Sequence, residues 1–394
     1  MTTAFADLFS TPEFLENPYP IYRELRNQAP AYWYPHSGLT GGMWFVTRHE
    51  DTEMVLKDLR FTKDISRVSA VPQQLSRHML DADPPDHTRL RALVSQAFTP
   101  RVVASLEPKI RSITEDLVSQ IKKGQDFSLI ESLAFPLPII VIAELLGVPD
   151  RDRHLFRDWS SHLIDGADIL TVTDPEAGQK AQMALGSIFK YFDDLIKVRR
   201  HDLQDDLVSL LIAAEDQQGK LTHGEILATC FLLLLAGHET TINLIGNGYH
   251  ALTRFPEQLQ HLRDHPEHLS TGVDEMLRFD APVQRATFRA ALEDLEIAGQ
   301  VIRKNQQVAA VIGAANRDER VFQNPDTLDV TRTPNRHLGF GRGIHFCLGA
   351  PLARLEAQIA FELLLPLGLP RVVHLERRPS TMFRGFRDLV LSWS

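Results

Sequence analysis

Residues 337–354 read HLGFGRGIHFCLGAPLAR, with three glycines within five positions, then a cysteine, then a helical pattern. Closely spaced glycines let a backbone turn through positive φ and approach a flat ligand without a Cβ in the way. Cys347 comes just before the helical pattern, where free backbone N–H groups favour the thiolate over the thiol. A thiolate on such a loop suits an axial ligand of haem iron. The alternative is a glycine turn beside a buried, inert cysteine, which would be preferred for a shorter motif.

This stretch resembles the cysteine loop of the cytochromes P450, the haem-thiolate monooxygenases. The family pattern is matched by Phe340, Gly341, Gly343, His345, Cys347 and Gly349. The resemblance implies that Cys347 ligates the iron of haem b (iron protoporphyrin IX), with Phe340 and Gly349 in the cofactor loop. It places His345 near a haem propionate. It also implies the cytochrome P450 fold, mainly α with small β-sheets, in which haem lies between a long central helix and the Cys-loop helix.

The composition of the chain favours one domain. Its 394 residues are 43% hydrophobic and 24% charged, which is ordinary for a soluble globular protein. The sequence has no linker-like run, low-complexity tract or repeat. We therefore predict a single domain over residues 1–394, with a β-rich N-terminal portion at about 30–60. C-terminal strands are expected at about 295–312 and 370–394.

Charge and cysteine content restrict the partners and the compartment. A formal net charge of -9 argues against nucleic acid. Residues 1–17 lack the basic and apolar regions of a signal peptide, and the most apolar run, 226–237, is too short to cross a bilayer. Only two cysteines occur, so no disulfide framework is expected. The prediction is a cytoplasmic monomer that binds neither nucleic acid nor membrane.

A second candidate for anion binding follows two prolines. His87 and Arg91 are four residues apart and share one face of a predicted helix, where they would present two donors to an anion. For an isolated pair, a solvated basic face is the usual alternative. P450s have a helix that begins with a similar Pro-Pro-acid-His run, and the resemblance implies that His87 and Arg91 contact haem propionates. Arg289 aligns with another family arginine that pairs with a propionate.

Residues 222–255 form the longest helical pattern in the chain. Thr222 followed by Glu225 is a capping-box start. The sequence AGHETT at 236–241 places glycine, an acid and two threonines in the middle of this helix, against local propensity. Such a departure often marks function, although a buried helix with an incidental polar patch is the alternative.

The functional interpretation of AGHETT is oxygen activation. Cleavage of the O–O bond needs protons from positioned donors, which Glu239 and Thr240 would provide as catalytic residues. Ala236 and Gly237 would leave room for dioxygen. The segment resembles the Ala-Gly-x-acid-Thr pattern of the P450 central helix, and that resemblance favours use of dioxygen and electrons over use of peroxide.

Two further groups of residues complete the prediction. Glu275 and Arg278 are three apart, which usually indicates a solvated pair, but they resemble the buried structural Glu-x-x-Arg pair of the family. Candidate substrate contacts are mostly apolar, so a hydrophobic small molecule is expected. They are Val68, Val71, Ile169, Leu233, Val283, Ala286, Thr287 and Phe383.

The predicted function is a monooxygenase that inserts one oxygen atom from O2 into its substrate, typically as a hydroxylation. No flavin-binding G-x-G-x-x-G after a strand and no cysteine cluster for an iron–sulfur site occur, so separate electron donors are expected. These would be a ferredoxin or flavodoxin and its NAD(P)H-dependent reductase, docking near Arg336 and Arg342. A peroxide-driven peroxygenase and a non-catalytic haem ligand sensor are the alternatives.

Overall fold

The computed structural model describes residues 9–35, 41–68, 78–167, 174–216, 221–287 and 289–393. Its backbone contacts divide the chain into two compact units. Unit 1 comprises Met1–Phe61, Leu106–Leu137 and Thr240–Ser394, and unit 2 comprises Thr62–Ser105 and Pro138–Glu239. Helices α5 (Pro100–Ser119), α6 (Pro136–Leu145) and α10 (His223–Arg254) contain residues of both units.

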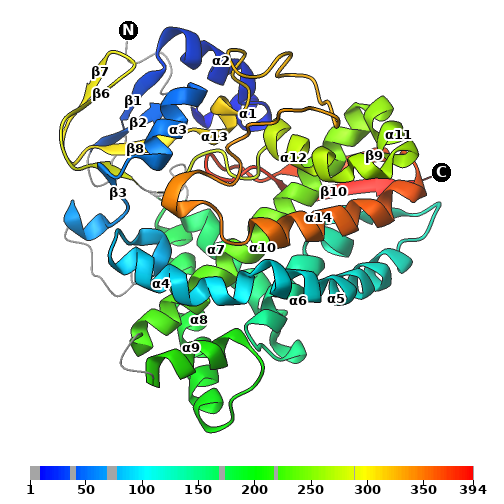
Figure 1. Cartoon of the computed structure of the whole chain (residues 1–394). Helices are drawn as coiled ribbons and strands as arrows, with labels where there is room; N and C mark the ends of the chain where they lie inside the picture. Colours follow the sequence, from blue (N-terminus) through cyan, green and yellow to red (C-terminus); the bar gives the residue numbers. More distant parts are fainter. Residues whose placement is uncertain are drawn as a thin grey trace. The chain divides into compact units, whose positions relative to one another are not determined.

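Unit 1 contains most of the β-structure (Figure 1). Its helices are α1 (Pro12–Glu16), α2 (Tyr19–Gln28), α3 (His49–Lys57), α11 (Pro256–Asp264), α12 (Leu269–Phe279), α13 (Ile312–Ala315) and α14 (Ala350–Leu364). One sheet has the order β1 (Ala31–Pro35), β2 (Gly42–Val46), β8 (Gln307–Ala310), β5 (Ala290–Ala291), β3 (Phe61–Thr62). A second sheet has the order β4 (Asp126–Ser128), β10 (Phe386–Ser392), β9 (Arg371–Arg377). A third sheet is the pair β6 (Leu295–Ile297) and β7 (Gln300–Ile302). The expected mainly α architecture with small sheets is confirmed.

Strand β8 is the centre of the first sheet. It pairs in parallel with β2 and is buried at all four positions, as its apolar sequence predicts for a strand covered on both faces. The β6–β7 hairpin turns through Ala298 and Gly299, whose φ values of 50° and 75° define a type I′ turn. The strands expected at about 30–60 and 295–312 are therefore present.

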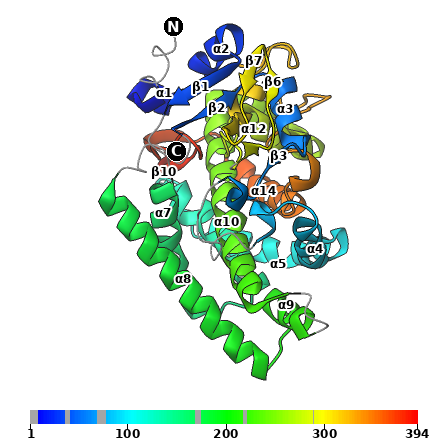
Figure 2. The same cartoon turned by 90° about the vertical axis from the view of Figure 1, so that its left-hand side faces the viewer.

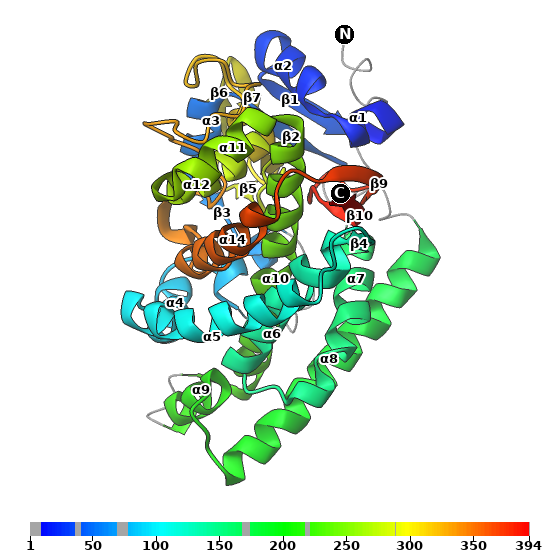
Figure 3. The same cartoon turned by 90° about the vertical axis from the view of Figure 1, so that its right-hand side faces the viewer.

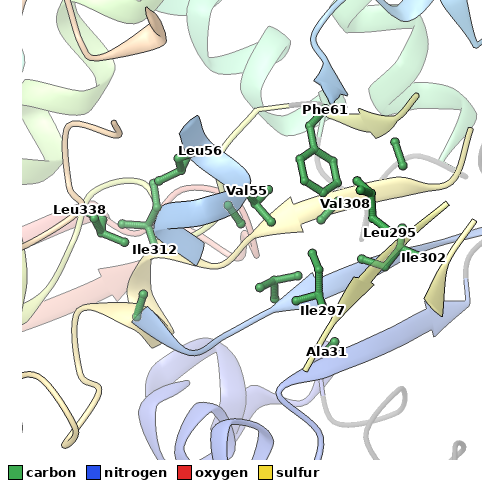
Figure 4. Packing of buried hydrophobic residues seen from close by; sticks show 14 of the residues in the cluster. Ala31, Val55, Leu56, Phe61, Leu295, Ile297, Ile302, Val308, Ile312 and Leu338 are labelled. Atoms are coloured by element: carbon green, nitrogen blue, oxygen red, sulfur yellow. The ribbon is translucent and has the colours of Figure 1, made fainter. Parts of the chain in front are cut away.

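The core of this part of unit 1 is an apolar cluster that joins the sheets to helix α3 (Figure 4). Val55 and Leu56 of α3 lie with Val308 of β8 and with Ile312. Leu338 belongs to the same cluster and is fully buried. The first residues of the cysteine loop are thus anchored in the hydrophobic core.

Helices α12 and α14 lie side by side in unit 1 (Figure 3). The C-terminal part of α10 packs closely against both, because a Cβ at Gly248 would lie 2.8 Å from Met276 Sδ and 2.8 Å from Phe361 Cζ. Glycine at this position permits the close approach of three helices.

Unit 2 is helical in its described part, with α7 and α8 packed side by side (Figure 2). Its helices are α4 (Asp86–Val94), α7 (Leu155–Ala167), α8 (Pro175–His201), α9 (Leu207–Asp216) and the first part of α10. Asp174 caps α8 by accepting a hydrogen bond from the Glu176 backbone N–H at 2.9 Å.

Helix α10 runs without interruption from His223 to Arg254. The predicted capping box is present, because the Thr222 backbone N–H donates to Glu225 Oε2 at 2.8 Å and the Glu225 N–H donates to Thr222 Oγ1 at 3.3 Å. Among the described helices, α10 alone is long and apolar enough to cross a membrane, and 61% of its apolar stretch is buried inside the protein. Burial of that kind is typical of the core helix of a globular protein.

Candidate active site

The cysteine loop is a tight turn closed by backbone hydrogen bonds. The Cys347 N–H donates to the Phe340 carbonyl at 2.9 Å, and the Gly341 N–H donates to Leu338 O at 2.8 Å. Gly341 and Gly343 have φ values of +71° and +73°, a region that glycine alone occupies without strain. Helix α14 begins at Ala350, three residues after the cysteine. The sulfur is therefore carried on a glycine turn that leads directly into a helix N-terminus.

Side chains from other elements of unit 1 hold this loop. The Leu338 N–H donates to Asn316 Oδ1 at 2.7 Å. Arg354 of α14 stacks its guanidinium 4.5 Å from the centre of the Phe340 ring and donates to Asp274 Oδ1 at 2.8 Å. Burial would raise the pKa of the Asp274 carboxyl, but hydrogen bonds from His337 and Arg354 hold it below its usual value. Neither Asn316 nor Asp274 is among the predicted site residues, because a single polar side chain does not reveal its distant hydrogen-bond partner.

The Glu275–Arg278 pair is buried and connects α12 to the segment before the loop. Arg278 Nε and Nη2 donate to the two Glu275 carboxylate oxygens at 2.7 Å each, and neither side chain is exposed. Arg278 Nη1 also donates to the carbonyl of Asn316 at 3.0 Å and of Pro325 at 2.8 Å. The pair therefore supports Asn316, which in turn holds Leu338.

Arg289 provides a test of whether haem fits unit 1. Its residue surface is only 5% exposed, and its one hydrogen bond runs from Nη1 to Thr287 O at 3.1 Å. Burial lowers the pKa of Arg289 to about 10, and no carboxylate among the described residues pairs with it. A buried guanidinium without an anion is costly, so a carboxylate from outside the chain fits this position. A haem propionate is such a group.

The cysteine loop presents apolar surface as well. Phe340, Phe346, Cys347 and Leu348 are all only half-buried, and His345 lies in the same half-buried stretch. Apolar side chains exposed together beside a cysteine suit contact with a porphyrin ring. Both observations in unit 1 agree with the predicted cofactor.

In unit 2, His87 and Arg91 lie on α4. His87 is 3% exposed. Burial, followed by the charge of Arg91, lowers the pKa of the His87 imidazole below its usual value. Arg91 is half-buried. The two side chains therefore influence one another across one helix turn, as their spacing predicted.

The AGHETT segment occupies the middle of α10. Ala236 is exposed although Leu234 and His238 on either side are buried. Glu239 is 5% exposed and Thr240 is half-buried. A Cβ at Gly237 would lie 2.9 Å from Ile142 Cδ1 of α6, so close helix packing is one physical reason for this glycine.

The predicted substrate contacts are only partly brought together. Val283 forms an isolated antiparallel bridge with Phe383, and both side chains are half-buried. Val283 and Ala286 also pack against the apolar cluster of unit 1. The remaining described candidates are Val68 and Thr287, which are half-buried, and Leu233, which is 6% exposed. Val71 and Ile169 lie outside the described residues.

Comparison with known proteins decides the family. The sequence model described as Cytochrome P450 matches residues 16–367. This chain is a cytochrome P450. Its relatives include the cytochrome P450 monooxygenase PikC of Streptomyces venezuelae, which is 39% identical over 97% of this chain and 92% of that protein.

Solved P450 structures share the fold as well. A myxobacterial P450, CYP267B1, in complex with myristic acid superposes with a TM-score of 0.93 and 38% identity, covering 99% of this chain and 100% of that one. P450BioI in complex with an acyl carrier protein ligated to hexadec-9Z-enoic acid superposes with a TM-score of 0.89 and 39% sequence identity. The match covers 97% of this chain and 100% of that one. The P450 fold predicted from the cysteine loop is thus confirmed, and the protein is a haem-binding oxidoreductase of the bacterial monooxygenase type.

Proposed function

We propose that the Cys347 thiolate would ligate the haem iron and that this P450 oxygenates a hydrophobic small molecule. The observation that carries the proposal is the cysteine loop, in which two positive-φ glycines and the bond from Cys347 N–H to Phe340 O present the sulfur before α14. When bound, haem supplies the iron at which dioxygen is activated, with thiolate ligation favouring O–O cleavage. The N–H groups at the start of α14, with Gly349 as N-cap, moderate the charge on the sulfur.

In unit 1, Arg289 and His345 are proposed to bind haem propionate. In unit 2, His87 and Arg91 of α4 are proposed as propionate ligands because they match the family pattern. Arginine forms paired, charge-assisted hydrogen bonds with carboxylates, and these are stronger than neutral ones. The missing counter-ion of Arg289 supports its part in this set most directly.

Glu239 and Thr240 are proposed to move the protons. With haem in place, the Thr240 hydroxyl would be the hydrogen-bond donor on the oxygen side of the cofactor, and the Glu239 carboxyl would carry protons from solvent to that hydroxyl. Their adjacency on α10 and the exposure of Ala236 support this assignment, since a small exposed residue leaves room for a diatomic molecule.

The proposed substrate is hydrophobic. Val283, Ala286 and Phe383 offer half-buried apolar surface at the edge of the unit 1 core. The complex of CYP267B1 with myristic acid supports an apolar chain as one possible substrate.

Electrons are proposed to come from a ferredoxin or flavodoxin with its NAD(P)H-dependent reductase. We further propose a cytoplasmic monomer in which both compact units act as one domain. The P450 family supports the need for separate donors, since bacterial members commonly use them.

The reduced carbon monoxide spectrum tests the thiolate ligand. Wild type should show the band of sulfur coordination, and Cys347→Ser should lose it. Cys230→Ala is the matched control, because Cys230 is fully buried in α10 and burial raises the pKa of its thiol. The proposal fails if Cys347→Ser keeps the thiolate band or if Cys230→Ala loses it.

A further inference from the structure

A cavity of about 560 Å³ lies in unit 1, apart from every residue assigned above to haem, oxygen or substrate. It is formed by the junction of α1 and α2, the ends of α10 and α12, and strand β9 with the turn before β10. Its charged lining consists of Arg23, Arg254, Arg317, Arg377 and Arg384 with Glu16, Asp280 and Asp326. Five guanidinium groups against three carboxylates leave an excess of two positive charges.

Some of these charges are neutralised within the protein. Asp280 Oδ1 accepts hydrogen bonds from the Tyr19 hydroxyl at 2.6 Å and from Arg384 Nε at 2.5 Å. Arg384 donates its other nitrogens to the carbonyls of Leu15 at 3.1 Å and Glu16 at 2.8 Å. Burial would raise the pKa of Asp280, but Arg384 and Arg377 lower it to about 2. Asp280 and Arg384 thus form a complete structural pair.

Arg317 is also engaged in hydrogen bonds within the protein. Its Nε donates to Phe279 O at 2.8 Å and its Nη1 donates to Asp326 Oδ1 at 2.9 Å. Its guanidinium lies 4.1 Å from the centre of the Tyr19 ring. It therefore forms a wall of the cavity, with each of its three nitrogens already donating a hydrogen bond.

Arg377 differs from these residues. Its side chain is 7% exposed, yet its shortest hydrogen bond is the 3.4 Å contact of Nε with Glu16 Oε1. Nη2 lies 3.9 Å from Asp280 Oδ2, and Nη1 has no partner among the described residues. Glu16 is 58% exposed at its side chain, so a ligand can displace it at little cost.

Arg254 lies at the rim of the same cavity. It is exposed, and no described residue gives it a hydrogen bond or an ion pair. His250, one turn earlier on α10, remains neutral because burial and then Arg377 lower the pKa of its imidazole to about 4. Arg377 Nη1 and the Arg254 guanidinium are therefore donors without a hydrogen-bond partner among the described residues.

We propose that this cavity binds a small organic anion carrying phosphate or carboxylate groups, with Arg377 and Arg254 as its principal ligands. The planar fork of arginine matches the two oxygens of either group. A volume of about 560 Å³ accommodates an organic molecule and exceeds what a single inorganic ion fills. The ligand joins the N-terminal helices to β9, so its binding stabilises unit 1.

Calorimetric titration of the haem-loaded protein tests the proposal, with pyrophosphate and citrate as probes at constant ionic strength. Saturable binding of at least one probe is expected. Arg254→Gln and Arg377→Gln should each weaken it about tenfold, the loss of one charge-assisted contact. Arg371→Gln is the matched control, because Arg371 is an exposed arginine of β9 outside the cavity. It should bind like wild type.

The probes separate the two sources of negative charge. Binding of pyrophosphate alone assigns a phosphate ligand, and binding of citrate alone assigns a polycarboxylate. Absence of saturation by either probe up to roughly 10 mM would overturn the proposal. So would equal affinities of the Arg254→Gln variant and wild type, a comparison that decides the matter even if Arg377→Gln fails to fold. Haem-site integrity in each variant is checked by the reduced carbon monoxide spectrum, which should not change.

Discussion

Replacement of Glu275 by glutamine should destabilise this P450 more than any change at a surface ion pair. The Glu275 carboxylate accepts from Arg278 twice at 2.7 Å, from Arg332 Nε at 3.0 and 3.1 Å, from the Asp329 N–H at 2.9 Å and from Asn335 Nδ2 at 3.1 Å. Glutamine at this position removes the negative charge that neutralises Arg278 and Arg332. It also replaces one carboxylate oxygen, a hydrogen-bond acceptor, with an NH2 group that donates. Breaking a buried pair by removing one partner costs about 3–5 kcal/mol. That is a large fraction of the roughly 5–15 kcal/mol by which domains are stable.

Urea unfolding followed by far-ultraviolet circular dichroism measures this cost. The midpoint of Glu275→Gln should fall by about 1 M or more, given slopes of about 1–3 kcal/mol per molar urea. Glu362→Gln is the control, because Glu362 pairs bidentately with Arg111 at 2.9 Å but its side chain is 47% exposed. The exposed pair should contribute at most about 1 kcal/mol. The reasoning is refuted if the two variants lose stability equally.

The same variant should loosen the cysteine loop before the protein unfolds. Arg278 donates to Asn316 O, and Asn316 Oδ1 accepts from the Leu338 N–H at the start of the loop. Release of Arg278 from Glu275 therefore removes support from the loop. In Glu275→Gln, the thiolate band of the reduced carbon monoxide complex should disappear at lower urea than the helical signal.

Three further changes have defined outcomes. Burial raises the pKa of the Glu356 carboxyl from 4.5 to about 8, so the native state keeps the proton at pH values where the unfolded state loses it. The free energy of unfolding should therefore fall by about 1.4 kcal/mol per pH unit between pH 4.5 and about 8. Unfolding curves of Glu356→Gln should lack this pH dependence. Gly343→Ala should lower the free energy of unfolding by at least about 1–2 kcal/mol, because Gly343 has positive φ. It should also weaken haem retention, because the added Cβ would lie 3.0 Å from Leu56 O. Gly186→Ala is the control, since a Cβ there meets open space and should not lower stability. Thr240→Ala should retain haem and substrate binding but divert electrons to hydrogen peroxide, so an unchanged ratio of product to electrons consumed would exclude Thr240 from proton delivery.

Local sequence rules predicted the parts of the structure that local chemistry determines. Two of the three closely spaced glycines, Gly341 and Gly343, have the positive φ that their spacing suggested, and Thr222 with Glu225 forms the expected capping box. Alternating or apolar runs identified β6 and β8, because strand periodicity is visible within a few residues. In each case the information lies within a short segment.

Features that depend on distant segments could not be predicted in the same way. Asn316 and Asp274 support the cysteine loop and the helix after it through contacts between segments far apart in the sequence. The cavity around Arg377 is formed by segments more than 300 residues apart, so its charge excess exists only after folding. The close packing of Gly237 could not be predicted either, because its contact with Ile142 joins two separate helices.

The buried arginines Arg278 and Arg289 differ in how their charges are neutralised, and this difference separates scaffold from site. Arg278 has Glu275 and three backbone carbonyls, so its charge is fully compensated by the chain and contributes to folding alone. Among the described residues Arg289 has one carbonyl partner and no carboxylate, so the desolvation of its charge opposes folding until an anion binds. Because an anion that binds only the folded state stabilises it by mass action, the cofactor should raise stability partly through Arg289 and not through Arg278. A buried arginine with donors left over among the described residues therefore indicates a ligand-binding residue. In the cavity of unit 1 this distinguishes Arg377, whose Nη1 has no hydrogen-bond partner there, from Arg384, whose three nitrogens all donate.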